Sequence, residues 1–202
     1  MTSPLYTEES SSETAMEGSL TVSWAETIEP ENTPIEIKLS KNRKINLFND
    51  NYIFEKEGVT EKVTLPHTWN AADGQSASDY YRGECIYTKK FAKPELKDGE
   101  QLYLEITGAN SSSKVSLNGK ELASHDGGYS TYHVNLTDGL MDENELEIKV
   151  DNSPNDHVYP QKADFTFYGG LYRDVRLITV PKNHFDLDYY GGKGFYVTPE
   201  VK

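Results

Sequence analysis

One stretch of the chain combines the residue types that bind sugars. Residues 164–175 read DFTFYGGLYRDV, so a single carboxylate, Asp164, precedes an aromatic-rich run and the pair Gly169 and Gly170. A carboxylate accepts hydrogen bonds from two neighbouring hydroxyl groups, and aromatic rings offer a flat apolar face. Paired glycines favour a tight turn. Asp164 therefore stands at the mouth of a turn, where it either binds a carbohydrate or caps the turn.

A second stretch carries similar groups. Residues 65–91 read as a long loop that contains Trp69, Tyr80 and Tyr81, followed by Arg82 and Gly83 and then a strand. The rings and the guanidinium suit a polar ligand. In the alternative interpretation, which composition alone favours, the same aromatic side chains cover the edge of the fold.

Other chemistry has little support in the sequence. There is no Gly-x-Ser-x-Gly motif, and the single cysteine, Cys85, lies in a strand pattern, where we expect a small buried side chain. The five histidines lack metal-ligand spacing. Asp151, Asp156 and His157 lie close together, but a solvated turn explains them better than a metal site. We therefore expect no metal and no cofactor.

The net charge of the chain limits the classes of molecule that it can bind. The 202 residues include 33 Asp and Glu against 20 Lys and Arg, a formal net charge of −13. Nucleic acids and anionic membranes are poor partners for such a surface, whereas a polar small ligand is compatible with it. No apolar run reaches membrane-spanning length. No signal peptide follows Met1, which favours a cytoplasmic location and leaves a secreted or cell-surface one open.

The elements that must position these residues are strands. Alternating apolar residues mark 101–107 and 145–151, and Asn118-Gly119 predicts a tight hairpin turn. No segment has a sustained helical stripe, so we predict an all-β fold of two packed antiparallel sheets. The expected buried positions are Leu102, Leu104, Ile106, Leu146, Ile148 and Val150. Further strands are expected near 45–54, 85–91, 129–136 and 173–180.

The predicted organisation has four parts. Residues 1–19 are rich in Ser, Thr and Glu and are expected to form a disordered acidic tail. Residues 20–43 form an N-terminal arm, and residues 44–185 form the sandwich. Residues 186–202 are a linker or the first strand of a following domain.

Residues 44–185 resemble the N-terminal sugar-binding domain of glycoside hydrolase family 2. That family includes β-galactosidases, β-glucuronidases and β-mannosidases, and its first domain is a jelly-roll (galactose-binding-like) antiparallel β-sandwich. The resemblance rests on INLFNDNYIF, VTLPHTWN, YYRGECIYTKKF, VSLNGKEL, HDGGYSTYHVNLT, NELEIKVDN and, most specifically, DFTFYGGLYRDVRLI.

The resemblance implies a multidomain parent enzyme. An immunoglobulin-like domain and a TIM barrel follow the jelly roll, and two glutamates of the barrel carry out a retaining mechanism. Nothing in this chain resembles the barrel, so we expect the fragment to be inactive alone. In the family, the aspartate at the position of Asp164 reaches into the barrel's active site and holds sugar hydroxyls.

The expected substrate-binding residues are Asp164, Arg82, Trp69, Tyr81 and Phe165, and no catalytic residue is expected in this chain. Arg173 and Asp174 are expected to form an ion pair at a strand start.

The residues of the motifs favour a β-galactoside as the carbohydrate partner. The chain departs from many members at residues 86–89, and it has Arg82 where one galactosidase branch has an asparagine. A β-glucuronidase or β-mannosidase domain, an independent carbohydrate-binding module and a purely structural sandwich remain the alternatives.

Overall fold

The computed structural model describes residues 20–21, 36–37, 43–71, 80–158, 167–189, 191–192, 194 and 197–200. The chain divides into two compact units, Met1–Lys41 and Asn42–Lys202. In the first unit, β1 (Leu20–Thr21) pairs antiparallel with β2 (Glu36–Ile37). Within the described ranges there is no helix whose length and apolar character would let it cross a membrane.

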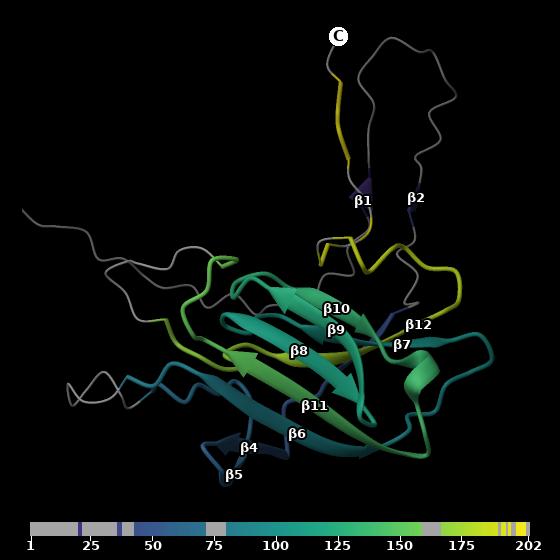
Figure 1. The fold of residues 1–202 in the computed structure, drawn as a ribbon. Coiled ribbons are helices and arrows are strands. Elements are labelled where there is room, and N and C mark those ends of the chain that lie inside the picture. The colour runs from purple at the N-terminus through teal and green to yellow at the C-terminus, as the bar shows by residue number, and fades with distance from the viewer. Residues whose placement is uncertain are drawn as a thin grey trace, which may run out of the picture. The chain divides into compact units, whose positions relative to one another are not determined.

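The described part of the second unit contains two antiparallel sheets (Figure 1). The larger has the order β5-β4-β6-β11-β8-β9, and the smaller has the order β10-β7-β12-β3. The larger sheet consists of β4 (Tyr52–Lys56), β5 (Val59–Val63), β6 (Glu84–Ala92), β8 (Ser112–Leu117), β9 (Lys120–Asp126) and β11 (Glu143–Asp151). The smaller consists of β3 (Lys44–Leu47), β7 (Gln101–Ile106), β10 (Tyr132–Asn135) and β12 (Val175–Val180). A short 3-10 helix, η1 (Thr137–Gly139), follows β10.

The core lies between the two sheets, as the alternation predicts. All six expected apolar positions in β7 and β11 are at most 1 % exposed, and they belong to one cluster with Tyr52, Phe54 and Tyr87. Cys85 is 1 % exposed and belongs to the same cluster, which confirms its expected structural role. Burial raises the pKa of its thiol to about 12, so the group stays protonated at neutral pH.

The predicted hairpin is confirmed. Asn118 and Gly119 join β8 to β9 with φ values of 52° and 79°, the positive angles that a two-residue turn of this kind requires. The Asn118 side chain also donates to the Gly139 carbonyl at 2.9 Å and accepts from the Glu145 backbone N–H at 2.9 Å. The turn is therefore fixed to β11 as well as to its own strands.

The strand expected near 45–54 is two strands in different sheets. β3 pairs with β12, whereas β4 pairs with β5 and β6. Between them Asn51 adopts a φ of 61°, which an extended strand does not allow. The alternation of the sequence continues through this point because both pieces are extended.

The outer face of the smaller sheet has an apolar cluster of its own. Tyr103, Ile178, Val180 and Leu187 are each at most 5 % exposed and pack together on this face. Tyr103 is therefore buried although it faces away from Leu102 and Leu104.

The antiparallel β-sandwich is thus confirmed, whereas the tail predicted at 1–19 lies outside the described residues. The boundaries proposed for the arm, the sandwich and the linker remain predictions.

Candidate functional site

Two buried asparagines join the loops that the sequence singled out. Asn70 ends the segment LPHTWN, and Asn152 follows the last residue of β11. Both are 0 % exposed, and the Asn152 Nδ2 donates to the Asn70 Oδ1 at 3.2 Å. A buried amide must find partners for both its donor and its acceptor, so the pair fixes the backbone around it.

Asn152 connects β11 to the residues on both sides of it. Its Nδ2 donates to the carbonyl oxygen of Phe167 at 3.1 Å and to that of Tyr81 at 3.4 Å. Its Oδ1 accepts from the backbone N–H of Gly83 at 2.9 Å. One side chain therefore holds the start of the YGG turn and the loop that precedes β6.

Asn70 and Thr68 bind the next residue of the turn. The Asn70 Oδ1 accepts from the Gly169 N–H at 2.8 Å, and the Thr68 hydroxyl donates to the Gly169 carbonyl at 2.7 Å. The Asn70 Nδ2 donates to the Tyr81 carbonyl at 2.9 Å. Both backbone polar groups of Gly169 are thus satisfied by side chains of one short loop.

Asn110, 3 % exposed, lies in the connection between β7 and β8 and also holds the turn. Its Nδ2 donates to the Tyr168 carbonyl at 2.8 Å, and its backbone pairs with Gly170 in both directions, at 3.2 and 3.4 Å. Residues 167–170 are therefore hydrogen bonded to three connections of the fold, those that contain Asn70, Asn110 and Asn152.

The residues that follow Asn152 are fixed by another asparagine, Asn155. The Oδ1 of Asn155 accepts from the backbone N–H groups of His157 and Val158, each at 2.9 Å, and its Nδ2 donates to the Ser112 hydroxyl at 3.3 Å. Val158 is 6 % exposed. Residues 155–158 are thus held beside the start of β8 by one side chain.

Close packing explains the two glycines. A Cβ atom on Gly169 would lie well under 3.0 Å from the Trp69 ring and 2.7 Å from the Asn152 Nδ2. Gly170 has a φ of 125°, and a Cβ there would lie 2.5 Å from the His67 carbonyl oxygen. The turn is therefore compatible with glycine alone at these two positions.

Trp69 lies against this turn, and the backbone carbonyl of Tyr81 accepts from the two asparagines that hold it. Trp69 is 8 % exposed and stacks on Phe54, with ring centroids 5.9 Å apart. Tyr81 is partly buried against the core, below the Lys56 ammonium at 4.6 Å. Burial is the main cause that raises the pKa of the Tyr81 hydroxyl, with smaller contributions from nearby acidic groups. The Trp69 ring is almost covered, an exposure that agrees with the edge-covering alternative.

Arg82 lies beside the same turn. Its Nε donates to the Asn152 carbonyl at 2.7 Å, and its guanidinium carbon lies 5.2 Å from the centre of the Phe167 ring. Its Nη2 is buried and has no hydrogen-bond partner among the residues that the structure describes. The guanidinium packs on the Phe167 ring.

Asp164 and Phe165 lie outside the described residues, so their predicted roles in substrate binding remain predictions, as do those of Arg82, Trp69 and Tyr81. The sequence analysis missed Thr68, Asn70, Asn110 and Asn152. All four are polar residues next to turns, a pattern equally typical of exposed loops, so the sequence carries no signal that separates them.

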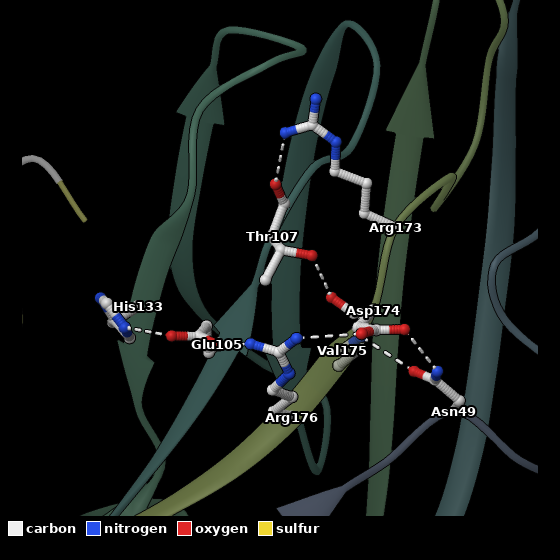
Figure 2. Close-up of polar contacts among 8 residues, drawn as sticks. All are labelled: Asn49, Glu105, Thr107, His133, Arg173, Asp174, Val175 and Arg176. Atoms are coloured by element: carbon white, nitrogen blue, oxygen red, sulfur yellow. Dashed lines mark hydrogen bonds and ion pairs between the residues drawn. The ribbon is translucent and has the colours of Figure 1, made fainter. Parts of the chain in front are cut away.

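A second polar cluster lies on the outer face of the smaller sheet (Figure 2). The Glu105 carboxylate bridges the His133 Nε2 at 3.0 Å and the Arg176 Nη1 at 3.1 Å. The Arg176 Nη2 contacts the Asp174 carboxylate at 2.9 Å, which also accepts from the Asn49 Nδ2 at 2.9 Å. The chain of contacts links β10, β7, β12 and the residues after β3.

This cluster corrects one prediction. Asp174 is ion paired, but with Arg176 and not with Arg173. The Arg173 Nη1 instead donates to the carbonyl oxygens of Thr107 at 3.4 Å and Tyr129 at 3.2 Å. Side chains two residues apart share one face of a strand, which adjacent residues do not, so Arg176 is the partner that faces Asp174.

The described residues offer hydrogen bonds and shape, and not an acid–base pair, at the candidate site. His67 lies beside the turn with its Nδ1 2.8 Å from the Tyr87 hydroxyl, and burial lowers its pKa, so it is neutral at physiological pH. Within the described ranges no three His, Cys, Asp or Glu side chains are grouped to hold a metal ion.

Comparison with known proteins identifies the family. Residues 65–187 match the model of the glycosyl hydrolase 2 galactose-binding domain-like family, which is more than half of the chain. The chain belongs to this family. The match includes the loop of Trp69 and Asn70, the loop of Arg82, and the YGG turn.

Similar proteins include two kinds of glycosidase. A β-glucuronidase of Bacteroides fragilis is 35 % identical over 173 residues, which is 82 % of this chain and 25 % of that protein. A β-galactosidase of Thermoanaerobacter pseudethanolicus is 28 % identical over 149 residues, which is 70 % of this chain and 20 % of that protein. The chain thus spans about a quarter or less of these relatives.

The solved structures that are similar to this chain include two β-glucuronidases. An FMN-binding β-glucuronidase from Facaelibacterium prausnitzii L2-6 is 44 % identical, with a TM-score of 0.72 over 75 % of this chain and 24 % of that one. Bacteroides uniformis β-glucuronidase 2, covalently bound to cyclophellitol-6-carboxylate aziridine, is 34 % identical, with a TM-score of 0.69 over 75 % of this chain and 20 % of that one.

Proposed function

We propose that the sandwich is the non-catalytic sugar-binding domain of a retaining family 2 glycoside hydrolase, and that Asp164 binds hydroxyl groups of the sugar in an active site completed by a downstream barrel. The observation that carries this proposal is the anchorage of the residues on either side of Asp164 in the sequence. The Val158 backbone N–H donates to the Asn155 side chain, and the Phe167 carbonyl accepts from the buried Asn152 amide. A binding group has to be held by the residues around it, and these fixed residues flank the segment that contains Asp164.

The proposed substrate is a β-glucuronide. The sequence motifs favoured a β-galactoside, but three similar proteins that are 35–44 % identical are named as two β-glucuronidases and one putative β-glucuronidase. A β-galactoside is the second candidate, because a β-galactosidase of Thermoanaerobacter pseudethanolicus and a putative β-galactosidase structure from Bacteroides fragilis, 32 % identical, also match.

The test is kinetic and uses the full-length parent enzyme. Asp164→Ala removes a charge-assisted acceptor, which costs about 1.5–3 kcal/mol, or roughly ten- to a hundredfold in kcat/KM. The assay compares 4-nitrophenyl β-D-glucuronide with the corresponding β-D-galactoside. An Asp164→Ala enzyme with unchanged kcat/KM on both substrates would remove Asp164 from the site. A preference for the galactoside would replace the first candidate by the second.

A further inference from the structure

The described residues that follow β12 cover part of the outer face of the smaller sheet. The ring of His184 lies against that of Tyr103 in β7, with centroids 5.6 Å apart. Leu187 packs in the apolar cluster that β7 and β12 form on this face. A Cβ atom on Gly191 would overlap the carbonyl oxygen of Thr131, the residue before β10. These contacts reach β12, β7 and the start of β10.

The fourth strand of the sheet, β3, is not covered in this way. All four of its residues are exposed. Ile45 and Leu47 lie opposite Ile178 and Arg176 of β12, so both belong to the outer face. Ile45 is 56 % exposed and Leu47 is 63 % exposed. Among the described strands β3 pairs with β12 alone, at the end of the sheet. Apolar side chains on an uncovered edge strand mark a contact surface.

Phe185 extends this surface. The residue is 64 % exposed, and its carbonyl oxygen accepts from the Arg43 Nη2 at 3.3 Å. Arg43 directly precedes β3, so the backbone of Phe185 lies beside the start of that strand. Ile45, Leu47 and Phe185 are together named the β3 patch.

The path of the chain after β12 limits what can cover the β3 patch. The described residues from Phe185 to Gly191 contact the outer face or the residues beside it, so a domain that follows starts on the side of the sheet that carries the patch. Four strands about 4.8 Å apart span about 14 Å, which is less than the diameter of a small domain, about 30 Å. A following domain is therefore large enough to reach the patch.

We infer that the next domain of the parent chain packs an apolar surface on the β3 patch, an inference that rests on the proposed function because that function places further domains after the sandwich. The chain covers 25 % and 20 % of the two curated relatives compared above, so a parent of that length has ample chain for this contact. The partner surface is apolar because the side chains of the patch have no hydrogen-bonding groups and gain free energy only by leaving water.

Thiol labelling measures whether the patch is covered. Leu47→Cys is prepared in the isolated 202-residue chain and in the full-length parent enzyme, and mass spectrometry follows the rate at which a maleimide modifies residue 47. A covered thiol reacts only when the contact opens, so labelling should be at least roughly a hundredfold slower in the full-length enzyme. Equal rates in the two proteins would overturn the inference.

The matched control is Met141→Cys. Met141 is 60 % exposed and lies in the connection between η1 and β11, outside the β3 patch. Its labelling rate should be the same in both proteins. A slowing as large as that of Leu47→Cys would mean general shielding by the longer chain and would overturn the inference. If Leu47→Cys does not fold, Phe185→Cys replaces it, with the same expected result.

Other occupants of the patch give different results. Slow labelling of Leu47→Cys already in the isolated chain would assign the contact to residues 1–41 or to a second copy of the chain. Protection in the full-length enzyme that is lost on dilution, together with a smaller particle in size-exclusion chromatography, would assign it to a second enzyme molecule. Either result would overturn packing by the next domain.

Two assays distinguish failure of this inference from failure of the proposed function. Unprotected Leu47→Cys together with reduced kcat/KM for the Asp164→Ala enzyme would refute the packing and leave the proposed function standing. Protected Leu47→Cys together with unchanged kcat/KM for Asp164→Ala would refute the sugar-binding role and leave the packing standing.

Discussion

The backbone of Gly169 lies so close to the indole ring of Trp69 that no side chain fits between them. A Cβ atom on residue 169 would lie well under 3.0 Å from the ring atoms Cε2 and Cζ2, a separation that real Cβ atoms do not adopt. The YGG turn and the loop of Trp69 are therefore in direct contact, and one cannot move without the other.

Replacing Gly169 by alanine should destabilise the domain. Overpacking of a filled interior costs about 1–3 kcal/mol, because the ring or the turn has to shift. Urea unfolding of the wild-type and Gly169→Ala chains measures the difference in the free energy of unfolding. The replacement Trp69→Phe removes the part of the ring that clashes, so the two changes together should cost less than the sum of their separate effects. Strict additivity would show that the contact is not the cause.

The cluster of Figure 2 predicts an acid-sensitive domain. The hydrogen bond from His133 is the largest cause that lowers the pKa of Glu105, and the hydrogen bond from Asn49 is the largest cause that lowers the pKa of Asp174. A carboxyl group with a lowered pKa in the folded chain stabilises that chain above its unfolded pKa of about 4, and this stabilisation is lost as the pH falls through the folded pKa.

The variant Glu105→Gln should therefore weaken the dependence of stability on pH. At pH 7 it should cost about 1–3 kcal/mol, because a charged hydrogen bond is lost. Once the pH has fallen below the lowered folded-state pKa of Glu105, the wild-type and variant chains should become similar, since Glu105 is then protonated in both states of the wild type. Glu145→Gln is the control, because its ion pair with Lys90 is exposed, with an oxygen–nitrogen distance of 3.5 Å. It should cost less than about 1 kcal/mol at every pH. Equal pH profiles for wild type and Glu105→Gln would contradict the assignment.

Two adjacent lysines, Lys89 and Lys90, should differ sharply in how much they stabilise the folded domain. Lys89 is 8 % exposed, and its ammonium donates to the carbonyl oxygens of Phe48 at 3.0 Å and Asp50 at 2.6 Å. The ammonium also lies 3.6 Å from the centre of the Phe48 ring. Burial lowers its pKa, against the smaller opposing effect of the Asp50 charge. Lys89 thus fixes the residues that cross from β3 to β4.

We expect Lys89→Met to lower the free energy of unfolding by about 2–3 kcal/mol, because two carbonyl oxygens lose a charged donor. Lys90→Met should change it by less than about 0.5 kcal/mol, because the Lys90 side chain is 79 % exposed. Chemical unfolding at pH 7 compares the two variants. Similar losses would show that the ammonium of Lys89 is not the stabilising group.

The strands of the sandwich were predictable because the pattern that indicates them, alternation of apolar and polar residues, lies within each short segment. The apolar positions in β7 and β11 alternate, and each side chain faces the core as the period of two requires. The break between β3 and β4 was not predictable in this way. Both pieces are extended, and the change of sheet depends on Asn51 and on the distant ammonium of Lys89.

The buried asparagines that hold the candidate site together were not predictable for a related reason. Asn70 and Asn152 are 82 positions apart, and each follows residues that also suit an exposed turn. A polar residue is buried when the fold supplies its partners, and those partners come from loops that meet only in three dimensions. The aromatic and glycine residues could be found because their chemistry is visible in one short segment.

The last prediction concerns the isolated chain. If the domain supplies only part of the sugar subsite, its contacts amount to one charged hydrogen-bonding group, worth about 1.5–3 kcal/mol. A Kd of 1 mM requires about 4.1 kcal/mol, so titration calorimetry with methyl β-D-glucuronide or methyl β-D-galactoside should give a Kd weaker than about 1 mM. An independent carbohydrate-binding module would bind more tightly. A micromolar Kd that is abolished by Asp164→Ala would establish such a module and refute the half-site, whereas a weak Kd, together with reduced turnover of the parent Asp164→Ala enzyme, supports the shared site.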